Sequence, residues 1–284
     1  MGIEVETGRP RIGTTMSDLT GRRALITGAS RGVGFGVAKM FAAAGAEVVA
    51  TARSEERLQN LAREIDADGG LIRTIPGDLS TRAGTRELAR QCGDVDILVN
   101  NAAHLTAVRQ SIIVEDDETW DMEFAVNLTA PVTLMQALVP GMVKRGSGVV
   151  INISTIAVRM TNPMDTAYAA SKSGLEVATR SAALDLGQYG VRVNAIALGM
   201  TATEIWDDMP VPGMTIEEMG KLVVPIGRAA DVSEVAALCL FLASDAAPAI
   251  NGSVITLDGG MTAGTFRPSG LNMRVSRQHE TATS

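Results

Sequence analysis

The chain has 284 residues, of which 46% are hydrophobic and 20% are charged. This composition is typical of a globular protein with a large core and excludes a chain that is disordered throughout. The net charge of −7 at pH 7 argues against a nucleic-acid-binding protein. Two cysteines and two histidines exclude a disulfide scaffold and a zinc cluster, so we expect no metal site.

The two ends of the chain differ in composition from its middle. Residues 1–18 are polar, mixed in charge and without periodicity, so we predict a disordered extension there. We also predict a loose C-terminal tail at residues 265–284. The first fifteen residues contain no apolar run of the kind found in secretory signal peptides. We therefore expect a cytoplasmic protein.

One uncharged stretch, Phe124–Val143, reaches the length of about 20 residues that can span a bilayer. It also contains Pro131, Pro140 and several polar residues, among them Gln136. We predict a buried helix here and no membrane partner.

From residue 23 onward, short apolar runs alternate with stretches of helical periodicity. The predicted strands are Arg23–Thr27, Glu47–Ala52, Leu71–Ile75, Asp96–Asn100, Gly148–Ile153, Val191–Ala197 and Ser253–Leu257. The predicted helices are Gly32–Ala44, Glu55–Asp66, Thr81–Cys92, 119–144, Ala167–Tyr189, and two that open at the capping boxes Thr215-x-x-Glu218 and Asp231-x-x-Glu234. Strands joined by helices run parallel, so the fold class is α/β. We predict a single-domain, doubly wound Rossmann fold over residues 19–264, in which helices cover both faces of a seven-stranded parallel sheet.

A glycine-rich segment, Thr27–Gly34, lies between the first predicted strand and the first helix and reads TGASRGVG. Glycine permits a tight turn and lets backbone N–H groups approach a pyrophosphate, while the N-terminus of the following helix attracts the anion. The predicted nucleotide-binding loop comprises Gly28, Ser30, Arg31, Gly32, Val33 and Gly34.

The end of the second predicted strand indicates which dinucleotide binds. An acidic residue at this place would bond the ribose 2′-hydroxyl of NAD, but the sequence reads Ala50-Thr51-Ala52-Arg53. Arg53 and Arg31 can together hold a 2′-phosphate. The alternative is that both are ordinary solvated arginines. We predict that NADP(H) is preferred and that NAD(H) remains possible.

Several further motifs follow in a fixed order. They are the glycine spacing Gly28-x-x-x-Gly32-x-Gly34, NNAA at Asn100–Ala103, and YAASK at Tyr168–Lys172. Together they resemble the short-chain dehydrogenase/reductase family over about Leu19–Gly264, and within it the 3-oxoacyl-carrier-protein reductase-like branch. Two positions depart from the family pattern: Ala103 replaces a glycine, and Leu198 replaces a proline.

The resemblance implies a set of site residues. The catalytic residues would be Asn127, Ser154, Tyr168 and Lys172, where Ser154 orients the substrate oxygen and Asn127 holds a water that relays protons to the lysine. The cofactor would also contact Asp78 and Leu79 at the adenine, Lys172 at the nicotinamide ribose beside Tyr168, and Asn101, Ala102, Gly199, Thr201 and Thr203 elsewhere.

The residues themselves explain the chemistry of the Tyr–Lys pair. Tyr168 and Lys172 are four residues apart on a predicted helix and so lie on one face. A nearby ammonium favours the phenolate form of a tyrosine, which can then exchange a proton with a carbonyl or alcohol oxygen. With hydride supplied by the cofactor, the predicted reaction interconverts a ketone and a secondary alcohol, with Tyr168 as general acid and base.

Other functions stay open at this point. One is an NAD-dependent secondary-alcohol dehydrogenase of the hydroxysteroid-like kind. Another is a 3-oxoacyl-carrier-protein reductase, which would need a basic docking patch. A third is a nucleotide-sensing scaffold without turnover, which would be expected to lack the tyrosine or the lysine.

The substrate is expected to be a small carbonyl compound or alcohol. The segment Glu204–Leu222 is rich in Met and Pro and is typical of a substrate lid. Trp206 and Met209 could line an apolar substrate pocket there, or simply pack.

Assembly is also predicted from two apolar helices. Phe124–Val143 and Ala167–Tyr189 are rich in apolar residues, and members of the resembled family pair these helices. We expect a homotetramer with two-fold interfaces.

Overall fold

The computed structural model describes residues 18–106, 110–204, 206 and 213–265. The predicted extension at residues 1–18, apart from Asp18, lies outside the described residues. So does the predicted tail at residues 265–284, apart from Thr265, and so does Met209. The domain boundaries at residues 19 and 264 therefore stay predictions.

The sheet is parallel, has seven strands and follows the order β3-β2-β1-β4-β5-β6-β7. The strands are β1 Arg23–Thr27, β2 Glu47–Ala52, β3 Leu71–Pro76, β4 Ile97–Asn100, β5 Gly148–Thr155, β6 Val191–Leu198 and β7 Val254–Leu257. The main helices are α1 Gly32–Ala43, α2 Glu55–Ala67, α3 Arg82–Cys92, α4 Asp117–Phe124, α5 Ala130–Arg145, α6 Thr166–Leu186, α8 Ile216–Val223 and α9 Val232–Ala243. Each predicted strand lies within two residues of an observed one, and the predicted α/β fold class is confirmed.

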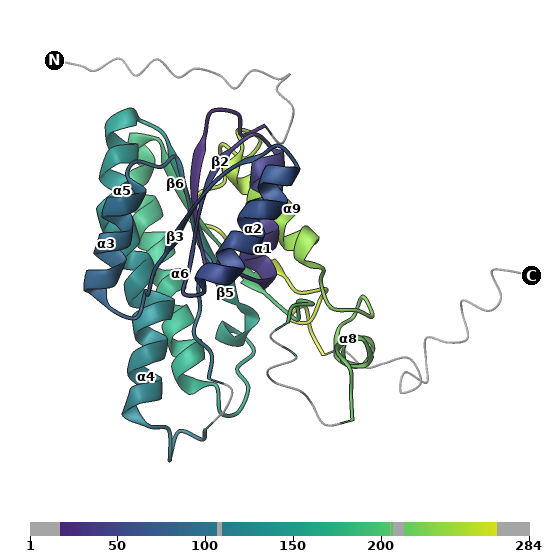
Figure 1. The fold of residues 1–284 in the computed structure, drawn as a ribbon. Helices are drawn as coiled ribbons and strands as arrows, with labels where there is room; N and C mark the ends of the chain where they lie inside the picture. The colour runs from purple at the N-terminus through teal and green to yellow at the C-terminus, as the bar shows by residue number, and fades with distance from the viewer. Residues whose placement is uncertain (1–17, 107–109, 205, 207–212, 266–284) are drawn as a thin grey trace, which may run out of the picture.

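Helices cover both faces of the sheet, with α1, α2 and α9 on one side and α3, α5 and α6 on the other (Figure 1). Each face has its own apolar core. Phe41 and Leu58 are fully buried on the first side, and Leu134 and Met142 on the second. This two-sided burial explains why the central strands carry almost no polar alternation.

Helix starts follow the local sequence. The side chain of Ser54 accepts a hydrogen bond from the backbone N–H of Arg57 and caps α2. Both predicted capping boxes are present, at the starts of α8 and α9. These caps satisfy backbone donors that the first helical turn leaves without partners.

The uncharged stretch forms part of one long helix, Asp117–Arg145, which by length and composition alone could cross a membrane. The predicted helix is present, and half of its most apolar window is buried inside the domain. The helix contains a π-helical turn, Ala125–Thr129, between α4 and α5, in which the N–H of Ala130 donates to the carbonyl of Ala125.

The strand order places the candidate site. Neighbouring strands β1 and β4 continue into connections that run to opposite sides of the sheet, so the order reverses between them. A crevice opens beyond the carboxyl ends of the strands at such a reversal, where ligands bind in doubly wound folds.

Candidate active site

A cleft of about 520 Å³ opens at this reversal. It is lined by nine of the residues predicted to hold the cofactor, namely Gly28, Ser30, Arg31, Arg53, Asp78, Leu79, Asn101, Ala102 and Thr203. The predicted cofactor residues Gly32, Val33, Gly34, Gly199, Thr201, Tyr168 and Lys172 do not line it. Sequence reasoning missed other lining residues, among them Ser54, Arg57, His104, Met122 and Glu204.

The glycine-rich turn is held closely against the loop that follows β4. The side-chain amide of Asn101 donates to the carbonyls of Thr27 at 2.9 Å and Gly28 at 3.2 Å. A Cβ on Gly28 would lie 2.8 Å from the Cα of Ala102. A Cβ on Gly34 would lie 2.4 Å from the Asn101 amide nitrogen. Packing therefore requires glycine at both positions. The hydrogen bonds of the Asn101 side chain hold the turn after β1 against the loop after β4.

The first turn of α1 faces the cleft side of this loop. Arg31 is the N-cap residue, but its side chain makes no capping hydrogen bond. Gly32 follows with φ of +55°, a backbone conformation that glycine adopts freely. The helix thus presents backbone N–H groups and the positive end of its dipole, an arrangement that attracts a phosphate group.

Positive charge gathers where β2 ends. Arg53, Arg57 and Arg31 are exposed and line the cleft. In the loop after the neighbouring strand β3, the Asp78 carboxylate accepts from the backbone N–H of Ser80 at 2.9 Å and from its hydroxyl at 2.8 Å. These two hydrogen bonds hold the pKa of Asp78 below its ordinary value, so the group is ionised at neutral pH.

His104, in the loop that follows β4, also lines the cleft. Burial lowers its pKa, and the positive charge of Arg53 lowers it further. The imidazole is therefore neutral at pH 7, which leaves the charge of the cleft to its arginines and carboxylates.

Tyr168 and Lys172 lie on one face of α6, as the spacing predicted. Tyr168 is half-buried, and Lys172 is 2% exposed. The Lys172 ammonium donates to the carbonyl of Ile153 on β5 at 2.8 Å. Burial lowers the pKa of Lys172 to about 8, so the group sits much closer to neutrality than a surface lysine.

Asn127 is fully buried in the π-helical turn. Its amide nitrogen donates to the His104 carbonyl at 2.9 Å and to the Ser171 hydroxyl at 3.2 Å, and its oxygen accepts from the His104 N–H at 2.8 Å. Asn127 thus joins the long helix to the β4 loop and to α6. Both of its amide hydrogens are used within the protein, and the predicted water-relay role stays a prediction.

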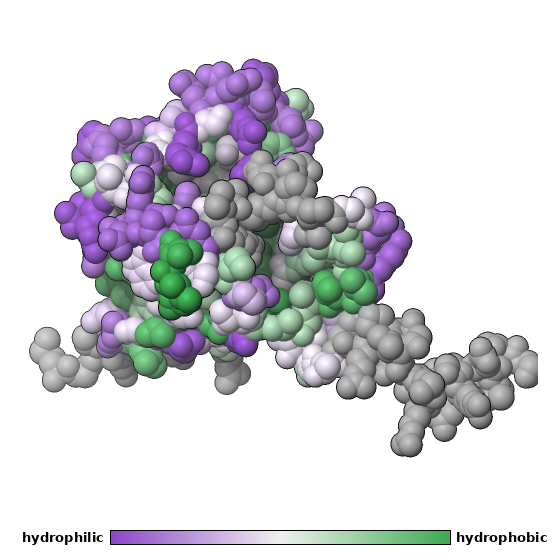
Figure 2. Space-filling model, turned by 90° about the horizontal axis from the view of Figure 1, so that it is seen from below, coloured by the Kyte–Doolittle hydropathy of each residue, from purple (hydrophilic) through white to green (hydrophobic). Residues whose placement is uncertain are grey.

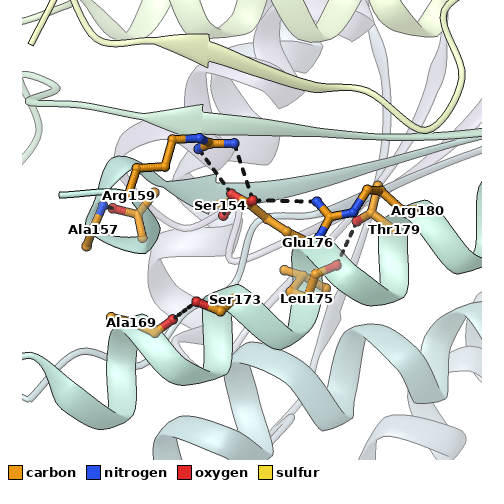
Figure 3. Close-up of polar contacts among 10 residues, drawn as sticks. Ser154, Ala157, Arg159, Ala169, Ser173, Leu175, Glu176, Thr179 and Arg180 are labelled. Atoms are coloured by element: carbon orange, nitrogen blue, oxygen red, sulfur yellow. Dashed lines mark hydrogen bonds and ion pairs between the residues drawn. The ribbon is translucent and has the colours of Figure 1, made fainter. Parts of the chain in front are cut away.

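Ser154 is placed differently from the expectation. Side chains alternate along β5, and Asn152 and Ser154 both point towards α6, where Asn152 donates to Thr179 at 2.8 Å. The Ser154 hydroxyl donates to the carboxylate of Glu176 at 2.9 Å (Figure 3). Ser154 is 3% exposed and gives its one hydrogen to this carboxylate. In this geometry Glu176 occupies the Ser154 hydroxyl, and the expected hydrogen bond from Ser154 to a substrate oxygen stays a prediction.

The neighbouring residue, Thr155, is the less buried of the two. It is half-buried and, by strand alternation, points away from the side that Ser154 faces. Its oxygen accepts from the N–H of Ala157 at 3.2 Å, which leaves its hydrogen to be donated. The sequence offers a pair of consecutive hydroxyl residues, and strand alternation lets only one of them face Glu176 on α6.

The segment after β6 is held in place by close packing of Gly199 against Asp258 and by a hydrogen bond from Trp206 to Thr201. A Cβ on Gly199 would lie 2.7 Å from the Cα of Asp258, so glycine is required there even though Leu198 replaces the family's proline. The indole N–H of Trp206 donates to the carbonyl of Thr201 at 2.8 Å. Trp206 thus secures the start of the predicted lid; its predicted contact with substrate stays a prediction.

Comparisons with known proteins agree with this geometry. A family model described as enoyl-(acyl carrier protein) reductase matches residues 28–262. The chain is 35% identical over 250 residues to L-xylulose reductase of Bos taurus, which covers 86% of this chain and 98% of that protein. It is 34% identical over 248 residues to the 3-oxoacyl-(acyl-carrier-protein) reductase of Thermotoga maritima, again covering 86% and 98%. The chain belongs to the short-chain dehydrogenase/reductase family.

A solved structure of this family has the same fold. The gluconate 5-dehydrogenase from Burkholderia cenocepacia J2315, solved in complex with NADP and tartrate, matches with a TM-score of 0.81 and 32% identity. The match covers 88% of this chain and 98% of that one. The resemblance stated from the sequence motifs is therefore confirmed over most of the short-chain dehydrogenase/reductase domain.

Proposed function

We propose that the protein is an NADP(H)-dependent oxidoreductase that interconverts a ketone and a secondary alcohol. The observation that carries the proposal is the Tyr168–Lys172 pair on one face of α6, with Lys172 bonded to the end of β5. The glycine-lined, arginine-rich cleft and the NADP-bound relative support it.

The residues of the cleft fit such a cofactor. The uncapped N-terminus of α1 and its glycines suit a pyrophosphate. Arg31 and Arg53 suit a 2′-phosphate, and no carboxylate ends β2 to favour NAD(H) instead. When bound, the nicotinamide group would supply or accept the hydride. Asp78 would receive the adenine amino group, and Gly199, Thr201 and Thr203 would face the nicotinamide end.

The remaining chemistry is a proton transfer by this chain's own side chains. In reduction, Tyr168 donates its phenolic proton to the carbonyl oxygen, and in oxidation it takes the proton from the alcohol. The Lys172 ammonium favours the phenolate that remains. Burial lowers the pKa of Lys172 to about 8. The Lys172 side chain is therefore positively charged below that pH and becomes neutral above it.

The hydroxyl that steadies the substrate oxygen belongs to Thr155 in this proposal. Its hydrogen is available, whereas that of Ser154 is donated to Glu176. Two donors on one oxygen would stabilise the negative charge that develops there during hydride transfer.

The surface at the carboxyl ends of the strands helps to decide between a small-molecule substrate and a carrier-protein partner. Segments that leave β4 and β6 reach this end, and Figure 2 shows apolar patches there. Among its exposed side chains are the apolar Ile112 to Val114 and Leu222. The helices that begin nearby open on acidic residues, Asp117 and Glu118 in α4 and Glu217 and Glu218 in α8. Such a surface suits a free small molecule better than an acidic carrier protein, which would need a basic patch.

The predicted assembly and location are carried forward as proposals. The outer face of α6 exposes Val177 at 57% and Leu184 at 84%, so it offers an apolar surface for pairing in a homotetramer. Cys92 and Cys239 are buried and unpaired, which suits the cytoplasm as a compartment.

The first prediction concerns the cofactor. Arg53→Ala should raise the dissociation constant of NADPH ~10–100-fold, because a charge-assisted contact to the 2′-phosphate is lost. The constant for NADH should change less than ~2-fold, since NADH lacks that phosphate. Fluorescence titration with both nucleotides measures this. Arg63→Ala, an exposed arginine elsewhere on α2, is the control. Equal weakening of both nucleotides would contradict the assignment.

The second prediction concerns the proton. Tyr168→Phe should lower the rate of ketone reduction ~10²–10⁴-fold without weakening NADPH binding. Lys172→Ala should do similar damage and also weaken NADPH. Alcohol oxidation by the wild type should rise with pH, because the accepting phenolate must be free of its proton. Tyr189→Phe, at the other tyrosine, should match the wild type. Near-normal turnover by Tyr168→Phe would refute the role of Tyr168.

The third prediction separates the two neighbouring hydroxyls. Thr155→Val should lower kcat/KM ~10²-fold by removing one donor to the substrate oxygen, and Thr155→Ser should restore most of the loss. Ser154→Ala should cost less than ~10-fold, since its hydroxyl serves a buried carboxylate. Steady-state kinetics of the three variants decide the matter. The reverse order of losses would return the role to Ser154.

The fourth prediction concerns assembly. Light scattering at micromolar concentration should give the mass of four chains. Leu184→Glu should yield a smaller species, because it places a charge on the apolar outer face of α6. Leu71→Glu, at an exposed leucine on β3, should leave the mass unchanged. A monomeric wild type would contradict the proposed tetramer.

A further inference from the structure

A buried carboxylate lies beside the catalytic strand without a part in the chemistry above. Glu176, on α6, is 3% exposed. Its Oε1 accepts from the Ser154 hydroxyl at 2.9 Å and from Nη1 of Arg159 at 3.4 Å, and its Oε2 accepts from Nη2 of Arg159 at 3.3 Å (Figure 3). Arg180, one turn further along α6, approaches Oε2 at 3.9 Å.

Burying this charge adds little to the stability of the fold. Removing a carboxylate from water carries a desolvation cost, and the attraction of its partners roughly offsets that cost. A neutral, well-packed side chain would hold α6 against β5 about as well. What the buried ion pair provides is a defined geometry between the groups that it joins.

The groups that it joins lie on either side of Thr155. Ser154 precedes Thr155 at the end of β5, and Arg159 follows it after the 3-10 turn Ile156–Val158. Thr155 caps that turn, and the N–H of Arg159 closes it on the carbonyl of Ile156 at 2.8 Å. The Glu176 carboxylate therefore binds both Ser154, which precedes Thr155 on β5, and Arg159, which follows the turn after Thr155.

The same helix carries the proton donor. Tyr168 lies two turns before Glu176 on α6, and Lys172 lies one turn before it. Lys172 bonds the carbonyl of Ile153 at 2.8 Å, so α6 is tied to the segment around Thr155 at Ile153, Ser154 and Arg159. The position of the Thr155 hydroxyl relative to the Tyr168 hydroxyl depends on these ties.

We propose that Glu176 is a positioning residue for the reaction: through Ser154 and Arg159 it holds the Thr155 hydroxyl in register with Tyr168. The inference rests on the proposed function, because it concerns two hydroxyls that converge on one substrate oxygen. Glu176 itself does not touch the substrate. A displacement of about 1 Å between reacting groups can cost ~10²-fold in rate. Loss of the Glu176 contacts should therefore lower kcat more than it weakens NADPH binding.

The experiment compares three charge-removing variants in the full chain. Glu176→Gln and Arg159→Gln should each lower kcat for ketone reduction ~10–100-fold, with the NADPH dissociation constant within ~2-fold of the wild type. Arg180→Gln is the matched control, because its contact lies within α6 and joins no second element. It should stay within ~2-fold.

A double-variant cycle distinguishes positioning from general destabilisation. If both residues act through one contact, Glu176→Gln combined with Arg159→Gln should cost no more than the larger single loss, within ~3-fold. Arg159→Lys should recover part of kcat. Melting temperatures are measured alongside, and the partly exposed Arg159 keeps the test valid if Glu176→Gln fails to fold.

The outcomes separate the two proposals. An active wild type whose Glu176 and Arg159 variants keep normal kcat, even with lowered melting temperatures, overturns the positioning role and leaves the proposed function intact. A wild type that reduces no ketone with NADPH, in a panel of small carbonyl compounds, overturns the proposed function and this role with it.

Discussion

The joint between β1 and β4 is the contact on which the cofactor end of the site depends. The buried Thr27 hydroxyl accepts from the N–H groups of Asn101 and Ala102, both at 3.0 Å, and the Asn101 amide returns two hydrogen bonds to the turn after β1. These contacts bring the two loops so close that a side chain at Gly28 or Gly34 would collide with backbone or amide atoms. The glycines that suit a pyrophosphate are thus also required by the fold's own packing.

The catalytic end depends on polar contacts placed between the sheet and α6. Asn100 donates to Asn152, which donates to Thr179 on α6, both at 2.8 Å. Lys172 and Glu176 continue this buried polar row towards the end of β5. Groups of this kind cost stability unless each is satisfied. In this row the side-chain oxygen of Asn100 has no hydrogen-bond partner among the described residues, whereas the other contacts named here are made. The contacts that are made fix one registration of the helix on the strand, which apolar packing alone would leave looser.

The sequence was sufficient for the elements and for the residues whose role is local. Apolar periodicity located the strands, Ser54 and the two capping boxes located helix starts, and the glycine turn needed only its place between a strand and a helix. The pairing of Tyr168 with Lys172 follows from helical spacing alone. Each of these features is decided by neighbours within a few positions.

The features that sequence reasoning missed are decided by contacts across the fold. Whether Ser154 or Thr155 faces the site depends on the phase of β5 against α6, which no local pattern specifies. The side chain of Asn127 is committed to His104, 23 residues away. Glu176 gave one usable signal, a charge on the same face of a helix as Lys172, but its partners Ser154 and Arg159 are set by tertiary structure.

The π-helical turn between α4 and α5 amounts to a single-residue insertion in an otherwise regular helix, because a π-helical turn is about one residue longer than an α-helical turn. About five residues at this wider pitch turn the chain as far as four residues of α-helix, so α4 and α5 keep the faces that they would have in an uninterrupted helix. The extra residue changes the turn itself, which carries the fully buried Asn127. Deleting one residue from Ala125–Thr129 would therefore leave the helices on either side nearly in phase and would displace Asn127 from its contacts with His104.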